Sequence, residues 1–262
     1  MNFKTIILEK EQRISRITLN RPTAMNSMTL EMFEELEAAF KEVMHDNEIR
    51  VLIITGSGRA FSSGADFSLV TYMAKLSSDE FIEKLRYLQS VATLIENMDK
   101  VAIAAINGYA LGGGLDLALA CDLRVAVEGA RMGEQYINVG IMPDLGGTQR
   151  LPRLVGLAKA KEMIFFGDMI DAGEAEEIGL INKVVAEDVF ESEITALSRR
   201  IADGPSVAIG LAKKAINSGL SKDINEGLEL EVYGQNLCMQ TEDVQEGITA
   251  FQQKRKPEFK GR

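Results

Sequence analysis

The stretch NGYALGGGLDLALACD, Asn107 to Asp122, joins three consecutive glycines to the start of an apolar helical pattern. Consecutive glycines cost backbone entropy and are poor helix formers. Their presence at Gly112 to Gly114 therefore indicates a place where the backbone comes close to another group. The preceding run VAIAAI, Val101 to Ile106, is apolar throughout and predicts a buried strand. Together these features predict a strand, a glycine loop and a helix start.

Around this stretch, the first 185 residues alternate between apolar strand runs and helical patterns. Strands are predicted as two short runs within residues 3–20 and at 51–56, 101–106, 122–127 and 181–185; helices are predicted at 29–45, from the Ser77 capping box to about Met98, and at 148–166. This alternation predicts an α/β core with parallel strands. From Glu187 to about Lys254 only helical patterns occur, separated at Gly204-Pro205 and Gly219. Such a helical appendage must pack on the core or on another subunit.

Composition restricts the class of protein. The 262 residues are 46% apolar and 26% charged, as expected for one large domain or one domain with an appendage. The net charge of −10 argues against a nucleic-acid partner. No run approaches the roughly 18 apolar residues of a membrane span, and the charged first ten residues lack a signal-peptide core. We therefore expect a cytoplasmic protein with no membrane partner.

The scarcity of histidine and cysteine limits the chemistry. His45 is the single histidine and lies in a polar turn at the end of a predicted helix. Triads that pair a serine or cysteine with histidine are therefore not expected, and zinc sites built on several histidines are excluded. Cys121 and Cys238 are far apart and form no metal-ligand spacing. The remaining candidates for catalysis are carboxylates, hydroxyls, amines and backbone groups.

Two glycine loops follow predicted buried strands, where parallel sheets gather ligands. The first, GSGRAF, has Phe61 where a dinucleotide fingerprint needs its third glycine, and it is the only support for a NAD-dependent dehydrogenase. A second use of the glycines is to aim one backbone N–H from each loop at a shared point, which makes an oxyanion hole. Two tight turns without a ligand are the alternative.

Four motifs, taken in order along the chain, resemble the crotonase superfamily of enoyl-CoA hydratases and isomerases. They are ITLNRPTAMNS (17–27), GRAFSSGADF (58–67), AAINGYALGGGLDLALACDLRVA (104–126) and GIMPDLGGTQRLPRLVG (140–156). The ending AFQQKRKPEFKGR is also similar to the C-terminus of that family. The resemblance spans nearly the whole chain and is far more specific than either glycine loop.

The resemblance implies a fold and a substrate. It implies a spiral core of stacked β-β-α turns over residues 1–200 and a C-terminal helical trimerisation region over 201–262, with trimers that pair into hexamers. It also implies an acyl-CoA thioester substrate. Coenzyme A is then part of the substrate, and neither a separate cofactor nor a metal is expected.

The resemblance also implies the groups that hold the thioester. Its oxygen would accept hydrogen bonds from the backbone N–H groups of Ala65 and Gly113. Contacts with coenzyme A would involve Thr23, Ala24, Met25, Asp66, Phe67, Ser68, Phe251, Lys254 and Lys260. Many relatives have lysine in place of Ser68, so one phosphate or adenine contact is missing or replaced here. The last three residues resemble those that reach the coenzyme A of a neighbouring subunit, with surface packing as the alternative.

The catalytic positions depart from the hydratase pattern of two glutamates. Asp116 stands at the first position and Tyr136 at the second, with Glu134 as a possible substitute two residues away. Asp144 stands where many hydratases have glycine, and relatives that shift double bonds, isomerise ring epoxides or displace halide carry a carboxylate there. Structural roles are the alternatives: helix capping for Asp144, a favourable helix dipole for Asp116 and packing for Tyr136.

We therefore interpret the chain as an acid–base enzyme that acts on an unsaturated acyl-CoA through a stabilised enolate. Asp144 is the expected principal acid or base, and Asp116 is its partner through water or Tyr136. The missing glutamates favour an isomerase or a specialised hydratase over an ordinary chain hydratase. A non-catalytic acyl-CoA-binding relative is the alternative. The acyl group is not specified, because residues 67–80, which would shape its pocket, contain no recognisable motif.

Overall fold

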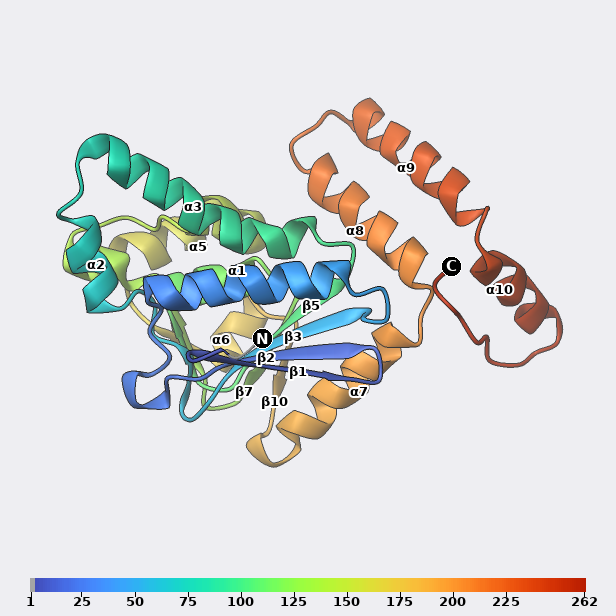
Figure 1. The fold of residues 1–262 in the computed structure, drawn as a ribbon, viewed down its shortest axis with the longest axis horizontal. Coiled ribbons are helices and arrows are strands. Elements are labelled where there is room, and N and C mark those ends of the chain that lie inside the picture. The colour runs from blue at the N-terminus through green and yellow to red at the C-terminus, as the bar shows by residue number, and fades with distance from the viewer. Residues whose placement is uncertain (1–2) are drawn as a thin grey trace.

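The computed structural model describes residues 3–262 and contains two β-sheets, of which Figure 1 labels the strands of the larger. The large sheet has the order β1 (Ile6–Glu11), β2 (Ile14–Leu19), β3 (Val51–Gly56), β5 (Val101–Ile106), β7 (Leu123–Val127) and β10 (Lys183–Val185). The small sheet has the order β4 (Ala60–Ser62), β6 (Tyr109–Leu111), β8 (Arg131–Gly133) and β9 (Ile170–Asp171). Neighbouring strands run parallel except for β1 with β2 and β8 with β9.

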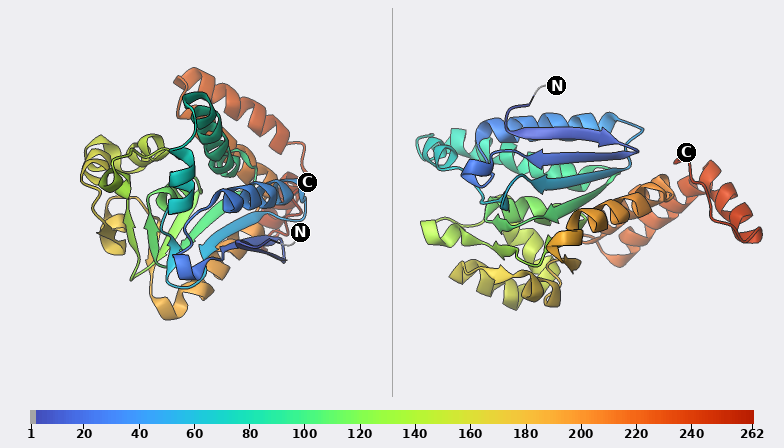
Figure 2. Two further views of the ribbon diagram at one scale, coloured as in Figure 1. Left: turned by 60° about the vertical axis from the view of Figure 1, so that its left-hand side comes forward. Right: turned by 90° about the horizontal axis from the view of Figure 1, so that it is seen from below.

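The chain repeats one supersecondary unit three times. Each turn places one strand in the large sheet (β3, β5, β7), the next in the small sheet (β4, β6, β8), and then a helix. These helices are α2 (Phe67–Met73) with α3 (Ser78–Asn97), then α4 (Gly113–Leu119), then α5 (Gly147–Phe166). The views in Figure 2 show the successive turns stacked on one another. This arrangement confirms the predicted spiral core of β-β-α turns.

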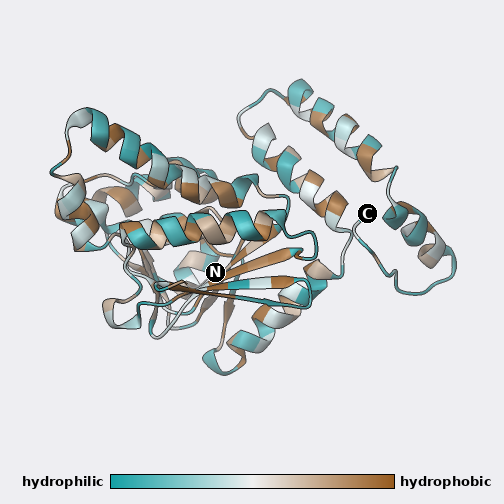
Figure 3. Cartoon of the chain, in the orientation of Figure 1, coloured by the Kyte–Doolittle hydropathy of each residue, from teal (hydrophilic) through white to brown (hydrophobic). Residues whose placement is uncertain are grey.

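The core lies between the large sheet and the helices that cover it. Strands β3 and β5 are buried along their whole length, as their continuous apolar sequences predict, and Figure 3 shows them as hydrophobic ribbons. Helix α1 (Leu30–His45) buries one apolar stripe and begins at Thr29, whose side chain accepts a hydrogen bond from the N–H of Met32. Helix α7 (Phe190–Ala202) packs against β2, β3 and β5.

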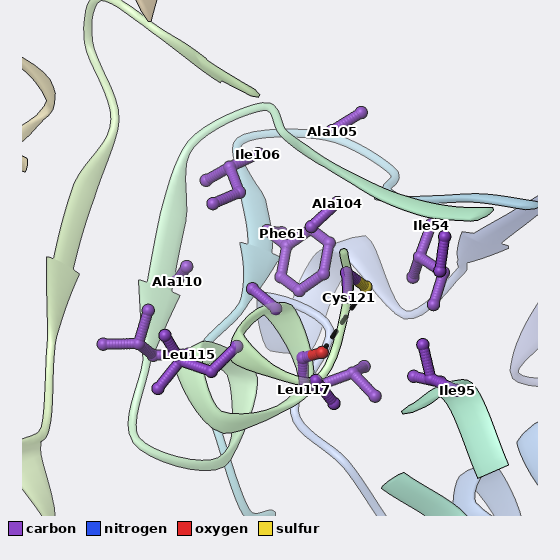
Figure 4. Close-up of a cluster of buried hydrophobic side chains, with 14 of the residues drawn as sticks. Ile54, Phe61, Ile95, Ala104, Ala105, Ile106, Ala110, Leu115, Leu117 and Cys121 are labelled. Atoms are coloured by element: carbon purple, nitrogen blue, oxygen red, sulfur yellow. Dashed lines mark hydrogen bonds between the residues drawn. The ribbon is translucent and has the colours of Figure 1, made fainter. Parts of the chain in front are cut away.

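The buried helix α4 is central to the fold. All seven of its residues are buried, and Figure 4 shows Leu115 and Leu117 among the side chains of Phe61 and Cys121. A side chain at Gly114 would collide with the backbone of Ser62, so glycine allows the helix to lie directly on β4. The glycine run thus brings the start of α4 against the neighbouring turn of the spiral.

The C-terminal helices extend away from the core in Figures 1 and 2. They are α8 (Ser206–Gly219), α9 (Ile224–Cys238) and α10 (Glu242–Gln252). Lys213 anchors α8, because its buried ammonium group donates to the carbonyls of Ile95 and Lys100 and pairs with Asp122 at 2.8 Å. Within residues 3–262, no helix has both the length and the apolar character needed to cross a bilayer.

Several short elements differ from the sequence-based expectations. The second sheet was not predicted, because strands of two or three residues are too short to display a periodicity. Helix α6 (Ala172–Glu177) and the 3₁₀ turn η2 (Gln135–Val139) were not predicted either. The 3₁₀ turn η1 (Pro22–Ala24) lies between the predicted strands and the first predicted helix, and η3 (Glu187–Val189) lies in the predicted helical region. Helix α5 lies where expected, but it is broken at Gly156, where φ is 78°.

Candidate active site

Two glycine loops meet at the start of α4. Gly64, which follows β4, has a φ of 93°, and a Cβ there would lie 2.8 Å from the carbonyl oxygen of Leu111 and 3.2 Å from the nitrogen of Gly113. Any larger residue would push the two loops apart, in a backbone conformation that L-residues rarely adopt. The loop that contains Ala65 therefore lies directly against the N-terminus of α4.

Both loops present a free backbone donor. The N–H of Met28 donates to Gly64, and the carbonyl of Met28 accepts from Asp66, so the intervening Ala65 N–H faces away from this bridge. Gly113 is the first residue of α4, where an N–H has no acceptor within the helix. Within residues 3–262, neither N–H has a hydrogen-bond acceptor. The two donors belong to adjoining loops, which is the arrangement an oxyanion hole requires.

The three side chains predicted to be catalytic lie beside these donors. The Tyr136 hydroxyl, carried on η2, donates to Asp116 Oδ2 at 2.6 Å, and it lies close enough to the Asp144 carboxyl to lower the pKa of that group. It lies 3.3 Å from the point that a Cβ on Gly113 would occupy, and its ring packs against Gly112. The structure thus gathers residues that are distant in sequence around the start of α4.

The site shifts the proton affinity of each of these groups. Burial raises the pKa of Asp116 to about 7, assisted by the charge of Asp144 and opposed by the hydrogen bond from Tyr136. Burial likewise raises the pKa of Asp144 to about 6. Burial, followed by the nearby carboxylates, raises the pKa of the Tyr136 hydroxyl well above its ordinary value. Asp116 and Asp144 can therefore exchange protons near neutral pH, whereas Tyr136 keeps its own.

Glu134 is more central than its sequence position suggests. Its side chain is fully buried, and burial together with the charge of Asp116 raises its pKa. From the sequence, Glu134 is expected only as a substitute for the missing glutamate. Its burial near Asp116 gives no sequence signal, because the residue directly follows the three-residue strand β8, which has no periodicity.

The start of α5 forms another wall of the site. Gly146 and Gly147 begin this helix without a side-chain cap, so the partial positive charge of its first turn faces the carboxyls. Arg150 lies one turn further on, but its guanidinium group donates to both oxygens of Glu96 and to the carbonyl of Leu145. The nearest arginine is therefore already paired.

The expected coenzyme A residues near the N-terminus adjoin the Ala65 loop. Thr23 and Ala24 lie on η1, and the carbonyl of Met25 accepts a hydrogen bond from Ser63 at 2.9 Å. Phe67 is 81% exposed at the start of α2. The segment 23–25 is thus tied through Met25 and Ser63 to the loop that carries the Ala65 donor.

The side chains of Asp66 and Ser68 form hydrogen bonds with each other at the start of α2. Asp66 caps the helix and accepts from both the N–H and the hydroxyl of Ser68. It also accepts from Arg21 at 2.9 Å and from Ser27 at 2.8 Å. These hydrogen bonds lower the pKa of Asp66 far below its ordinary value, with those from Ser68 the largest. The carboxylate therefore holds the Ala65 loop in place.

The C-terminal candidates lie elsewhere. Phe251 on α10 is 86% exposed, Lys254 follows that helix, and Lys260 lies near Glu242. Figure 1 and the right-hand view of Figure 2 place α10 at the end of the molecule opposite α2. Within one chain these residues do not join the site, and their expected contact with a neighbouring subunit stays a prediction.

Comparisons with known proteins agree with this geometry. Residues 9–262 match the family model described as enoyl-CoA hydratase/isomerase. Crotonyl-CoA hydratase from Syntrophomonas wolfei is 43% identical over 99% of each chain, and short-chain-enoyl-CoA hydratase from Clostridium acetobutylicum is 39% identical over the full length of both. The crystal structure of an enoyl-CoA hydratase from Bacillus anthracis has a TM-score of 0.93 at 37% identity, covering 99% of this chain and all of that one.

Proposed function

The chain belongs to the enoyl-CoA hydratase/isomerase family, and from this premise we propose that it adds water to the double bond of a short unsaturated acyl-CoA. The family match excludes the NAD-dependent dehydrogenase. The full-length similarity to hydratases replaces the other alternative, a non-catalytic acyl-CoA-binding relative, by an enzyme of this family. The names of two relatives, crotonyl-CoA and short-chain-enoyl-CoA hydratase, support the short acyl group. One observation carries the assignment of roles. The Tyr136 hydroxyl, which lies near Gly113, donates a hydrogen bond to Asp116 and lowers the pKa of Asp144.

The backbone donors stabilise the charge that develops during the reaction. In our proposal the thioester oxygen accepts from the N–H groups of Ala65 and Gly113, and it becomes an enolate oxygen when a nucleophile adds to C3. A preorganised donor of this kind contributes about 3 kcal/mol to the transition state. Backbone N–H groups do not titrate, which suits a site with several carboxyls.

Asp144 moves the proton. As a carboxylate it takes a proton from the water whose oxygen bonds to C3, while the electrons of the C2=C3 bond move toward the thioester carbonyl. The enolate then collapses and C2 takes a proton from Asp144, so that one water is consumed and Asp144 is regenerated. Its pKa of about 6 makes both protonation states accessible at neutral pH.

Tyr136 couples the two aspartates. A single hydroxyl proton can be donated to only one carboxylate at a time. When Asp144 carries a proton, it can donate to the Tyr136 oxygen while Tyr136 donates to Asp116. When Asp144 loses its proton, Tyr136 can turn toward it. Asp116 is therefore the partner of Asp144 through Tyr136.

Double-bond isomerisation is the second candidate. It requires one proton carrier that removes a proton from one carbon and returns it to another, with no bound water. The observation that favours it is the single partly exposed carboxyl, Asp144, against the fully buried Asp116. The oxyanion hole would serve the same enolate in either reaction.

Turnover in ¹⁸O-labelled water separates the two reactions. Crotonyl-CoA, a 3-enoyl-CoA, a dienoyl-CoA and a cyclic enoyl-CoA are incubated with the enzyme and analysed by mass spectrometry and NMR. Hydration predicts a 3-hydroxyacyl product that carries one ¹⁸O. A shifted double bond without ¹⁸O would replace the proposal by isomerisation, and no turnover of any of these esters would refute both.

The proposal includes substrate contacts, assembly and location. Coenzyme A would lie along the rim of residues 23–25 and 65–68, with no separate cofactor.

An exposed apolar face on and between α8 and α9 supports a homotrimer or hexamer. Its exposed members are Ile216, Leu220, Ile224, Leu228, Val232, Tyr233 and Leu237. Two free cysteines support a reducing, cytoplasmic location. Analytical ultracentrifugation tests the assembly, because a monomer at micromolar concentration would refute it.

A further inference from the structure

Glu134 is a fully buried carboxyl without a hydrogen-bond partner. Its relative exposure is 0%, and within residues 3–262 neither Oε1 nor Oε2 has a donor. An ionised carboxylate in such a position loses its hydration without compensation, which strongly destabilises a fold. The side chain therefore needs either a proton or a partner that supplies one.

The geometry provides that partner. A Cβ on Gly147, at the start of α5, would lie 2.9 Å from Glu134 Oε1 and closer still to Asp116 Oδ1. The two oxygens therefore converge on one small space, which exists because residue 147 has no side chain. In the described part of the chain Asp116 Oδ1 also lacks a hydrogen-bond partner, whereas Asp116 Oδ2 accepts from Tyr136.

We propose that Glu134 and Asp116 share one proton across the space beside Gly147, and that Glu134 thereby acts as a positioning residue for the Asp116–Tyr136–Asp144 chain. The inference deepens the proposed function and rests on it for its catalytic consequence. Glu134 touches neither the thioester nor the reacting carbons in this scheme. It acts only through Asp116.

The charges around the pair favour a single proton. Asp116 on α4, Asp144 in the loop before α5 and Tyr136 on η2 provide no positive charge. Arg150 on α5 lowers the pKa of Asp116, but its guanidinium group is paired with Glu96. The first turn of α5 supplies a partial positive charge of about half an elementary charge, which is too little to balance two carboxylates. Two ionised carboxylates in contact would therefore be opposed by both burial and repulsion. The raised pKa values of Asp116 and Glu134 agree with this geometry.

A bound cation is the other way to neutralise such a pair. Within the described chain, no group of three or more histidine, cysteine, aspartate or glutamate side chains is arranged to hold a metal ion. Two carboxyls with no further ligand make a poor cation site. A shared proton satisfies the same two oxygens and needs no additional group.

The shared proton has a consequence for the reaction. When Tyr136 turns toward a charged Asp144, Asp116 loses a donor at Oδ2. A proton held between Asp116 Oδ1 and Glu134 then keeps Asp116 from becoming an unpaired buried charge. Glu134 thus terminates a chain that runs through Asp116 and Tyr136 to the residue that moves the proton.

Infrared spectroscopy of the wild-type protein tests the shared proton directly. Samples at pH 7.5 are compared with and without ¹³C-labelled glutamate, and with ¹³C-labelled aspartate. A protonated-carboxyl band that shifts with either label, and that disappears in Glu134→Gln, is the expected result. The absence of any such band in the wild type overturns the proposal, even if no variant folds.

Two variants test the link to catalysis. Glu134→Gln removes the titrating neighbour but keeps a donor for Asp116, so the inflection that Asp116 contributes to the pH–rate profile should move down by about one pH unit. Glu134→Leu has similar bulk and no donor, so its inflection should not move down. The Glu134→Gln variant should therefore retain more activity than the Glu134→Leu variant. Equal inflections in both variants would refute the positioning role.

The outcomes separate this inference from the proposed function. A wild-type protein that shows the shifting band but turns over none of the tested esters would refute the function and leave the shared proton intact. An active wild type without the band would refute the shared proton and leave the function intact.

Discussion

Replacing Asp116 by asparagine should stabilise the folded protein while it impairs turnover. Asparagine has nearly the same shape and can still accept from Tyr136, but it cannot ionise. Asp116 is fully buried, and its pKa rises from 3.8 to about 7 on folding. The folded chain therefore binds this proton more tightly than the unfolded chain does, and ionisation of Asp116 weakens the fold.

The magnitude follows from the shift. Stability is undiminished below pH 4, falls as the pH rises between the two pKa values, and is lowest above pH 7. At about 1.4 kcal/mol per unit, the wild type loses about 4 kcal/mol in all, and about half of this by pH 5.5. The free energy of unfolding of Asp116→Asn should therefore exceed that of the wild type by about 2 kcal/mol more at pH 8 than at pH 5.5.

Urea unfolding at both pH values measures the difference, with the protomer concentration held constant because assembly also affects stability. Glu177→Gln, on the exposed side of α6, is the matched control and should show no such pH-dependent gain. If the stability advantage of Asp116→Asn over wild type is no larger at pH 8 than at pH 5.5, folding does not raise the pKa of Asp116 as its burial indicates. A pH-dependent advantage equal to that of the control variant would lead to the same conclusion.

The remaining predictions concern the donors and acids around the thioester. Gly113→Pro and Gly113→Ala both add a Cβ near Met28, but only proline removes the N–H, so its kcat should be at least about a hundredfold lower than that of the alanine variant; equal rates would remove Gly113 from the oxyanion hole. Tyr136→Phe deletes a hydrogen bond that lowers the pKa of Asp116, so the corresponding inflection of the pH–rate profile should move to higher pH, and an unchanged profile would contradict the coupling. Asp144→Asn should lower kcat at least about a hundredfold, and near-wild-type turnover on the true substrate would exclude Asp144 from catalysis.

The sequence predicts the layout of the core well, because its main strands are long and apolar. Residues 51–56 and 101–106 are buried at every position, and such runs are hard to place anywhere but inside a parallel sheet. The small sheet was not predicted, since β4, β6 and β8 have three residues each. Their pairing depends on the spiral that the longer strands build, so it cannot be predicted from the local sequence.

The site is only partly predictable for a related reason. Asp116, Tyr136 and Asp144 were identified through their positions within motifs, and the structure brings them together around one hydroxyl. The importance of Glu134 depends instead on which way a residue after a three-residue strand points, and on the missing side chain of Gly147. Contacts between elements so short require the assembled fold, so they cannot be inferred from spacing.

Asp116 and Tyr136 stand where the resemblance to the hydratases implies two glutamates, and this difference changes how charge is distributed in the site. Aspartate is one methylene shorter, and at this position it is fully enclosed, with Tyr136 between it and Asp144. A buried acid next to a second buried acid is destabilising, and Arg150, which lowers the pKa of Asp116, offsets this only in part because its guanidinium group is paired with Glu96. Such strain is commonly retained where activity needs it. If Asp116→Asn is both more stable and inactive, the carboxyl is present for chemistry; if it is more stable and fully active, the proton chain through Tyr136 has no catalytic role.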